Sequence, residues 1–349
     1  MTTKLIVAET DDQLARDLSY AADVIKAGGL VVFPTETVYG LGADATNAFA
    51  AKRIYAAKGR PSDNPLIIHI AKPEDAESYT ETNDTYYRLA RAFMPGPLTV
   101  ILTAKPTVPP ETRASLPTVA VRCPSNPIAR ELIRLSGVPI AAPSANISGS
   151  PSPTRAEHVI NDMTGRVEVI IDGGDCDFGL ESTIVKIDGD GELTLLRPGK
   201  ITVDDLLTVA ETVKIAGAVT AAIGEGETVL SPGMKYRHYA PKAPLALIDG
   251  DGSAYSRFLS ERDREKNIAA LVYSEDVQTI RTAAPEVFLY DLGPRNDEAA
   301  HARILFDILR DTDKHYFDEI YAPLPRQLGV GLALYNRLIR AAAYNIIRM

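Results

Sequence analysis

The chain has 349 residues, which exceeds the roughly 250–300 residues that one hydrophobic core usually serves, so its length favours two domains. Hydrophobic residues make up 45% and charged residues 24% of the chain, which excludes a disordered, collagen-like or coiled-coil protein. The 37 basic and 46 acidic residues give a net charge of −9, which argues against stable binding to nucleic acid or to an anionic membrane surface.

The apolar runs and the cysteines indicate the compartment. No apolar run approaches the roughly 18 residues of a membrane helix, and the N-terminal apolar stretch covers only Leu5 to Ala8, too short for a secretion signal. The two cysteines, Cys123 and Cys176, match no metal-binding spacing, and we expect two separate buried thiols rather than a disulfide. We therefore expect a cytoplasmic protein that contacts no membrane.

The first part of the chain, up to about residue 210, alternates short apolar runs with helical stretches, which is typical of an α/β domain. A helix is predicted from Ala48 to Lys58, ending at Gly59, and another is predicted to begin at the capping residue Asn126. Residues 182–187 and 192–197 flank an Asp-Gly-Asp-Gly turn and are predicted to pair as a hairpin. The other predicted strands are Leu30 to Phe33, Pro65 to Ile70, Leu98 to Leu102, Val119 to Arg122, Val138 to Ala142 and Val167 to Ile171.

A break rich in proline and glycine follows, at residues 224–244. No acidic residue occurs from Thr228 to Ile248, whereas Lys235, Arg237 and Lys242 are basic, so this segment is expected to face something negative. The elements predicted after it are the strands Leu245 to Ile248, Ile268 to Tyr273 and Val287 to Tyr290 and the amphipathic helix Ala299 to Leu309. This alternation indicates a small parallel sheet.

Two cations, Lys58 and Arg60, flank Gly59 at a predicted helix end and precede a loop with proline. Because a guanidinium forms bidentate bonds and an ammonium is a point charge, the pair suits a polyphosphate. The same pair could merely complement the negative end of the helix macrodipole, and a Lys-Gly-Arg alone favours that simpler explanation.

Two hydroxyl-rich segments accompany this pair. Residues 143–152 follow one predicted strand, and residues 33–42 leave another. Small hydroxyl and amide side chains after the carboxyl end of a strand lie where open α/β sheets bind ligands, although each segment alone is typical of a surface turn. Neither a P-loop nor a strand followed by Gly-x-Gly-x-x-Gly occurs, which argues against the ordinary nucleotide-binding folds.

Three segments in this order resemble the YrdC domain of threonylcarbamoyl-AMP synthases. They are Pro34-Thr-Glu-Thr-Val-Tyr-Gly-Leu41, Lys58-x-Arg60-Pro with Asn64-Pro-Leu66, and Pro143-Ser-Ala-Asn146. The segment Ser231-Pro-Gly-Met-Lys-Tyr-Arg-His-Tyr-Ala-Pro241 resembles the linker of the two-domain form of that enzyme. The resemblance covers about residues 10–245 by motif and the rest by position and size.

The resemblance implies a fold and a reaction. The fold would be α/β, with a twisted, open mixed sheet that has a concave basic face over residues 1–212, a linker over 213–243 and a smaller Rossmann-like α/β domain over 244–349. The reaction would convert L-threonine, bicarbonate and ATP, with Mg²⁺, into L-threonylcarbamoyl-AMP and diphosphate. Other proteins would then use the product to make threonylcarbamoyladenosine in tRNA.

The resemblance also implies roles for particular residues. Lys58 and Arg60 would be catalytic, because they would hold phosphates and compensate the charge of the departing diphosphate. Arg122 would clamp the carboxylate of threonine. The implied ATP-binding residues are Lys58, Arg60, Asn64, Thr118, Ser144, Asn146, Ser152, Arg197, Arg237, His238 and Tyr239. The implied threonine-binding residues are Thr35, Thr37, His69, Arg122, Ala142 and Ser182, and no protein ligand for a metal is identifiable.

Two other classes of protein stay open. A concave basic face could bind an RNA duplex in a ribosome-assembly factor, which the charge of −9 disfavours. A carbamoyltransferase of hydrogenase maturation uses a similar domain, but it should carry Cys-x-x-Cys repeats that two cysteines cannot supply. Outside the resemblance, Arg122 would suit a solvated strand end and His69 a buried core position.

The linker segment 231–241 is expected to act as a lid. Water can destroy threonylcarbamoyl-AMP, so a site that closes would protect it. Pro232 and Gly233 could form a bend, Tyr236 and Tyr239 could cover the site, and the side chains between them could make polar contacts. The alternative is a passive tether between two domains.

Overall fold

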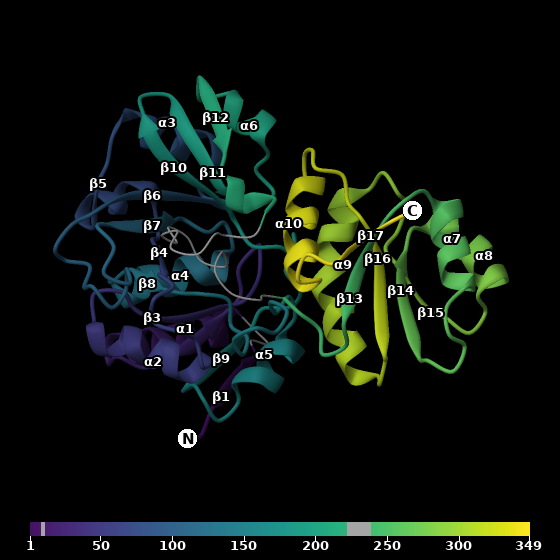
Figure 1. The fold of residues 1–349 in the computed structure, drawn as a ribbon. Coiled ribbons are helices and arrows are strands. Elements are labelled where there is room, and N and C mark those ends of the chain that lie inside the picture. The colour runs from purple at the N-terminus through teal and green to yellow at the C-terminus, as the bar shows by residue number, and fades with distance from the viewer. Residues whose placement is uncertain (8–10, 222–238) are drawn as a thin grey trace. The chain divides into compact units, whose positions relative to one another are not determined.

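The computed structural model describes residues 1–7, 11–221 and 239–349. The described residues form two compact units, one of residues 1–148 and 152–221 and one of residues 149–151 and 239–349 (Figure 1). Most of the predicted lid, with Arg237 and His238, lies outside the described residues. None of the helices within the described ranges is long and apolar enough to cross a membrane.

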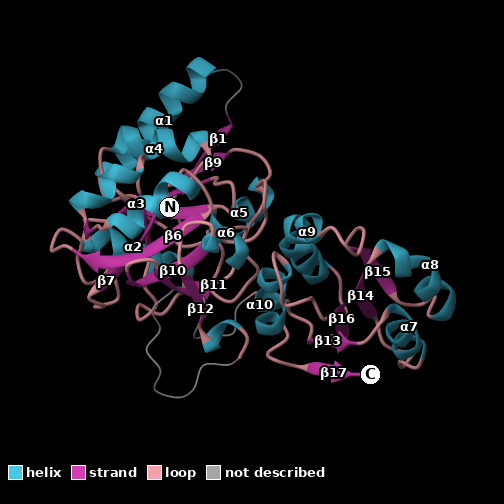
Figure 2. Ribbon diagram, turned by 90° about the horizontal axis from the view of Figure 1, so that it is seen from above, coloured by secondary structure: helices cyan, strands magenta, loops and turns pink. Residues whose placement is uncertain are grey.

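The first unit is built on a large twisted sheet (Figure 2). Its strands are β1 (Lys4–Val7), β2 (Val31–Phe33), β3 (Gly40–Asp44), β4 (Ile67–His69), β5 (Thr80–Glu81), β6 (Leu98–Ala104), β7 (Thr118–Arg122), β8 (Ile140–Ala141), β9 (Val169–Asp172), β10 (Thr183–Gly189), β11 (Glu192–Arg197) and β12 (Thr212–Ile215). They lie in the order β1-β9-β2-β3-β8-β4-β7-β6-β10-β11-β12, with β5 paired to β6. Because β4 pairs parallel with β7 and antiparallel with β8, the predicted mixed sheet is confirmed.

The helices of this unit begin and end where local signals place them. They are α1 (Asp11–Lys26), α2 (Ala48–Lys58), α3 (Asp84–Phe93), α4 (Pro127–Ser136), α5 (Ala156–Met163) and α6 (Val203–Leu207), with the 3-10 turns η1 (Pro73–Ser78) and η2 (Gly217–Val219). The side chain of Asn126 accepts hydrogen bonds from the first amides of α4, and α2 ends at Gly59, whose φ of 62° is the left-handed conformation that favours glycine. Both predicted helix positions are confirmed.

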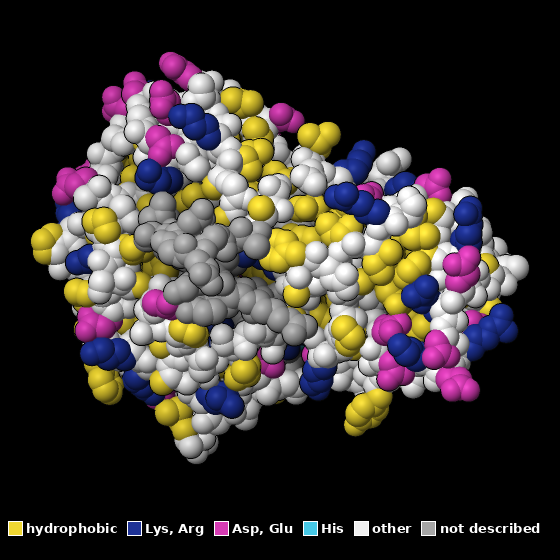
Figure 3. All heavy atoms as spheres, in the orientation of Figure 1, with side chains coloured by type: hydrophobic (Ala, Val, Ile, Leu, Met, Phe, Trp, Pro, Cys, Tyr) yellow, Lys and Arg dark blue, Asp and Glu magenta, His cyan; other side chains and the backbone are white. Residues whose placement is uncertain are grey.

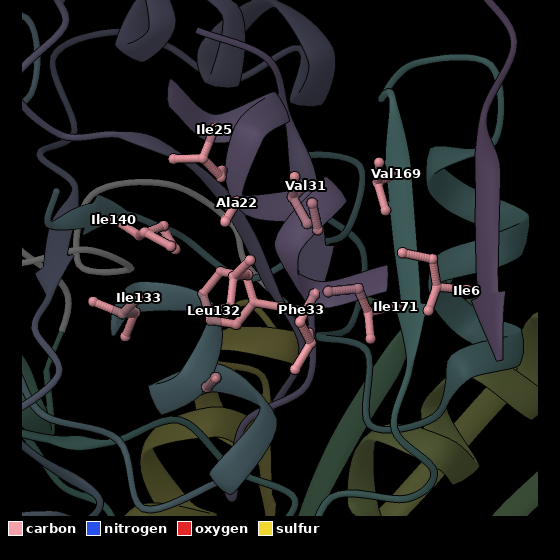
Figure 4. Close-up of a cluster of buried hydrophobic side chains, with 14 residues drawn as sticks. Ile6, Ala22, Ile25, Val31, Phe33, Leu132, Ile133, Ile140, Val169 and Ile171 are labelled. Carbon is pink, nitrogen blue, oxygen red and sulfur yellow. The ribbon is translucent and has the colours of Figure 1, made fainter. Parts of the chain in front are cut away.

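One hydrophobic core cluster of the first unit lies between α1, α4 and the strands β1, β2 and β9 (Figure 4). Its buried side chains include Ile6, Ala22, Ile25, Val31, Phe33, Leu132, Ile133, Ile140, Val169 and Ile171. Burying one such large side chain contributes about 1.5–3 kcal/mol. This packing fixes the end of β2, from which the loop 34–39 leaves toward the candidate site.

Strand β3 differs from the prediction, which treats residues 33–42 as a loop leaving a strand. The strand begins at Gly40, and its two glycines explain why its sequence gives a weak strand signal. Gly42 is required by packing, because a Cβ there would lie 2.7 Å from side-chain atoms of both Phe33 and Ile140.

The end of the first unit also differs from the prediction. Strand β12 pairs parallel with β11, so the sheet continues past residue 212, where the sequence places the start of the linker. The burial pattern of β12 is mostly exposed, which is typical of a short edge strand. Such a strand lacks the apolar run that marks the others.

The second unit is a three-layer α/β structure. Its elements are β13 (Leu245–Asp249), α7 (Gly252–Ser260), β14 (Ile268–Val272), α8 (Ser274–Ala283), β15 (Phe288–Asp291), α9 (Glu298–Asp311), η3 (Thr312–Lys314), β16 (Glu319–Pro323), α10 (Gly331–Ala341) and β17 (Ile346–Arg348). The strands pair in parallel in the order β15-β14-β16-β13-β17, with α7 and α8 on one face and α9 and α10 on the other (Figures 1 and 2). The predicted small parallel sheet is confirmed. Its order differs from that of dinucleotide-binding sheets, because β16 separates β13 from β14.

Candidate functional site

The pairing of the central strands of the first unit gathers residues implied for threonine. Parallel pairing of β4 with β7 sets His69 beside Arg122, where both strands end. Antiparallel pairing of β6 with β7 sets Thr99 opposite Arg122, and the hydroxyls of Thr99 and Ser182 lie 2.7 Å apart. His69, Arg122 and Ser182 therefore lie near one end of the central strands.

Arg122 is a buried cation with a buried carboxylate beside it. Its Nη2 donates to Glu36 Oε1 and to Thr37 Oγ1, both at 2.8 Å, and the residue is 4% exposed. Burial overturns the alternative of a solvated strand end. Among the described residues, Arg122 Nε and Glu36 Oε2 are buried without a hydrogen-bond partner. Such atoms are costly unless a ligand completes their bonds, so they mark a candidate binding position.

Glu36 is the residue that the sequence analysis missed. It lies within Pro34-Thr-Glu-Thr, between two threonines that were singled out. A single acid in a loop gives no signal by itself. The signal available was the role implied for Arg122: a guanidinium that clamps a ligand inside a protein requires a carboxylate beside it, and Glu36 is the acid of the Pro34-Thr-Glu-Thr motif.

The loop that carries Thr35 and Thr37 is held by their hydroxyls. Thr35 Oγ1 donates to the carbonyl of Val38 at 2.6 Å and accepts from the amides of Thr37 and Val38. The hydroxyls of Thr35 and Thr37 lie 2.8 Å apart. Thr37 Oγ1 in turn accepts a hydrogen bond from Arg122.

His69 is an uncharged imidazole. Burial, and secondarily the positive charge of Arg122, lower its pKa from 6.5 to about 3. Its Nδ1 lies 3.3 Å from the carbonyl oxygen of Ile140, which can only accept, so Nδ1 carries the proton of the neutral ring. Nε2 is then the ring atom that can accept a hydrogen bond.

Lys58 and Arg60 bind loop carbonyls. Lys58 is 2% exposed, and its Nζ donates to the carbonyls of Ser144 and Asn146 at 2.5 and 2.6 Å. Arg60 Nη2 donates to the carbonyls of Asn64 and Pro65, both at 3.1 Å. Lys58 thereby joins the end of α2 to the Ser-x-Asn segment, so the two parts of the implied motif do meet.

Asn64 is a further residue of this region whose buried polar atoms are unsatisfied among the described residues. The residue is 1% exposed, and within the described part of the chain neither Oδ1 nor Nδ2 has a hydrogen-bond partner. Continuing the parallel register of β4 and β7 backwards from Ile67 and Ala120 sets residue 65 beside Thr118. Asn64 and Thr118 therefore lie near the opposite end of the central strands from His69 and Arg122.

The implied ATP and threonine residues also meet at Ser182. Arg197 donates through Nε to the carbonyl and through Nη2 to the hydroxyl of Ser182, both at 3.0 Å. Next to it, Ser152 Oγ donates to Glu181 Oε1 at 2.5 Å. The amide of Ala142 donates to the carbonyl of Ile67, which places Ala142 by its backbone at the end of β8.

The second unit holds one of the implied ATP residues. Tyr239 is 5% exposed, and its ring stacks on Phe306 of α9 at 5.1 Å between centroids. Its proposed contact with ATP stays a prediction, as do the roles of Arg237 and His238.

Surface charge and thiols complete the description of the first unit. On the face drawn in Figure 3, acidic and basic side chains are mixed, and the concave basic face stays a prediction. Cys123 and Cys176 are free and buried, as predicted, and burial raises the pKa of both thiols, that of Cys123 to about 12. Within the described ranges, no group of three or more His, Cys, Asp or Glu side chains could hold a metal ion.

Comparisons with known proteins identify the family. The model Sua5_yciO_yrdC, described as "Telomere recombination", matches residues 23–199, and "Threonylcarbamoyl-AMP synthase, C-terminal domain" matches residues 201–343. The chain is 41% identical to the threonylcarbamoyl-AMP synthase of Bacillus subtilis over 353 residues, covering 100% of both, and 44% identical to that of Pyrococcus abyssi, covering 94% and 95%. The solved P. abyssi Sua5 complexed with L-threonine matches with a TM-score of 0.88 and 40% identity, covering 100% of this chain and 99% of that one. The resemblance of the sequence motifs is therefore confirmed, and the chain belongs to the family of threonylcarbamoyl-AMP synthases.

Proposed function

We propose that this chain makes L-threonylcarbamoyl-AMP and diphosphate from L-threonine, bicarbonate and ATP, in the cytoplasm, as a supply for tRNA-modifying proteins. The observation that carries the proposal is the buried pair of Arg122 and Glu36, each with one polar side-chain atom that has no partner within the described part of the chain. A buried cation beside a buried anion complements the carboxylate and ammonium of an α-amino acid. The P. abyssi relative, solved in complex with L-threonine, supports this substrate.

Threonine is proposed to bind as a zwitterion. Its carboxylate accepts from Arg122 Nε, and its ammonium donates to Glu36 Oε2, which satisfies both buried atoms. Its hydroxyl lies within the group formed by Thr37, Ser182 and the neutral imidazole of His69. Threonine differs from serine by one methyl group, so packing can discriminate between them by about 1–3 kcal/mol.

Glu36 is proposed to take the proton that makes threonine a nucleophile. Transfer of one ammonium proton to Glu36 Oε2 leaves a neutral amine, whose nitrogen attacks the carbon of bicarbonate. The carbon–hydroxyl bond breaks, and the hydroxide leaves as water with a proton of the amine. A carbamate oxygen then attacks the α-phosphorus of ATP, and the bond to the bridging oxygen breaks as diphosphate leaves. No covalent protein nucleophile is needed, and the chain positions the reactants and compensates charge.

ATP is proposed to lie toward Asn64. The unsatisfied amide of Asn64 offers both a donor and an acceptor, as an adenine or ribose requires. Lys58, Arg60 and Arg197 are the cations of the region for the phosphates. Mg²⁺ would arrive as the counterion of ATP, because it usually keeps several waters and is bound largely through substrate phosphates.

The test is a diphosphate-release assay in which threonine, bicarbonate and ATP are omitted in turn. Diphosphate is expected with all three present, and equal release without threonine or bicarbonate would refute the proposed reaction. Glu36→Gln keeps the shape of the side chain but cannot take a proton, so its turnover should fall and recover as rising pH deprotonates free threonine. Glu111→Gln is the control, because Glu111 pairs with Lys52 near the surface. An unchanged rate and pH profile in Glu36→Gln would reject the role of Glu36 but leave the reaction standing.

A further inference from the structure

The sheet of the second unit has a topological switch point beside β16. The chain leaves β13 and β14 toward α7 and α8 on one face, whereas it leaves β16, which lies between them, toward α10 on the other face. The connections after these neighbouring strands therefore diverge at the carboxyl edge of the sheet. In open α/β sheets, ligands bind in the crevice that such a divergence opens.

A cavity lies at this edge. Its volume is about 270 Å³, and it is lined by residues that directly follow β13, β14, β15 and β16 and by side chains of α9 and α10. At about 30 Å³ per molecule of liquid water, the space equals roughly nine waters. Leu292, Leu305, Leu334 and Leu338 contribute its apolar wall, and each of them is at most 4% exposed.

Two polar atoms at the cavity have no hydrogen-bond partner among the residues that the structure describes. His301 is 3% exposed, and its Nε2 donates to the carbonyl of Pro294 at 2.8 Å, so in the neutral ring Nδ1 is an acceptor. Tyr273 lies against His301, with ring centroids 5.1 Å apart. Across the described residues, neither His301 Nδ1 nor the hydroxyl of Tyr273 has a hydrogen-bond partner. A ligand with N–H or O–H donors would satisfy them.

The charges that line the cavity are already balanced. Arg295 pairs with Asp276 at 2.6 Å, and Arg326 pairs with Glu298 at 2.9 Å. The carboxylate of Glu298 also accepts from the amide of Gly331 at the start of α10, where an anionic ligand would otherwise be favoured. A charged ligand would therefore find no uncompensated charge here, and an uncharged one is favoured.

We propose that this cavity binds an uncharged nitrogen heterocycle of nucleobase or nucleoside size. The leucine side chains pack against its faces, and its N–H donors bind His301 Nδ1 and the hydroxyl of Tyr273. The site belongs to the second unit alone and does not depend on the reaction proposed for the first.

The test uses the full chain with ¹³C-labelled leucine methyl groups and adenosine as the probe. The signals of Leu305 and Leu334 are assigned with Leu→Met variants, and that of Leu196 reports on the first unit, so binding at each unit is followed separately. Adenosine is expected to shift the Leu305 and Leu334 signals saturably, and adenosine monophosphate is expected to bind there no more tightly. Tyr273→Phe should weaken adenosine binding about two- to tenfold, the value of one neutral hydrogen bond.

Tyr316→Phe is the matched control, because Tyr316 belongs to the same unit and is 95% exposed. Its adenosine affinity should equal that of the unchanged chain. Shifts confined to Leu196, the absence of a saturable shift at Leu305 and Leu334, or much tighter binding of adenosine monophosphate there would each overturn the proposal. So would a Tyr273→Phe chain that binds adenosine with full affinity.

Discussion

Replacing Asn64 by leucine should stabilise the protein while weakening its binding of ATP. Both polar atoms of this amide are buried without a partner among the described residues, and leucine has a similar size and no polar atom. An unsatisfied buried polar group costs about 1–3 kcal/mol, so Asn64→Leu should raise the free energy of unfolding by about that amount. For a unit of this size, each kcal/mol raises the melting temperature by about 2–4 °C.

The effect on ATP should have the opposite sign. Two neutral hydrogen bonds to the amide of Asn64 contribute about 1–3 kcal/mol together, so the loss of this amide should raise the Kd of ATP about five- to 150-fold. Melting curves with and without ATP measure both effects on one sample. Asn126→Leu is the control, because Asn126 caps α4 with two hydrogen bonds and its loss should destabilise the chain by about 1 kcal/mol. A destabilised Asn64→Leu chain with unchanged ATP affinity would refute the reasoning.

Three further outcomes are expected. Lys58→Met should lower the melting temperature and the turnover together, because the carbonyls of Ser144 and Asn146 lose their buried donor; an unchanged melting curve would contradict this. The free energy of unfolding should fall by up to about 1.4 kcal/mol per pH unit as pH drops from 6.5 toward 3, because the unfolded chain protonates His69 in that window and the folded one does not. Urea unfolding should show a steeper loss of stability with falling pH in the parent than in His69→Gln, in which carboxylates of lowered pKa such as Asp17 and Glu168 still contribute a slope. Finally, Cys123 and Cys176 should resist a thiol reagent at mildly alkaline pH until the chain is denatured, since burial raises the pKa of both; rapid labelling of the native chain would contradict their burial.

Apolar runs and caps were sufficient to predict many of the elements. The helix from Ala48 to Lys58 is confirmed with its bounds because Asn47, Gly59 and a helical pattern all agree. Strands β3 and β12 were missed for opposite reasons, since one is glycine-rich and fully buried and the other is short and exposed. The order of the strands in the two sheets could not be predicted from the sequence, because it depends on which strands pair over long distances along the chain.

In the candidate site, too, local sequence patterns predicted some features and long-range contacts decided the rest. The three motifs sufficed to name the family, but they did not reveal which groups the side chains of the site bind. Lys58 binds the carbonyls of the loop that carries Ser144 and Asn146, a contact between residues 86 and 88 positions apart. Glu36 was missed because its importance arises from Arg122, which lies in a distant strand. Such pairs exist only after folding.

The ion pair of Arg122 and Glu36 has a consequence for selectivity among the many small ions of a cell. The two side chains are 5% and 8% exposed and together carry no net charge. A simple carboxylic acid or a simple amine brings one charge, which would stay unbalanced in this buried place at a cost of several kcal/mol. A zwitterion brings both charges and leaves the balance unchanged. The electrically neutral pair of Arg122 and Glu36 can therefore exclude metabolites with a single charge, whatever the shape of their side chains.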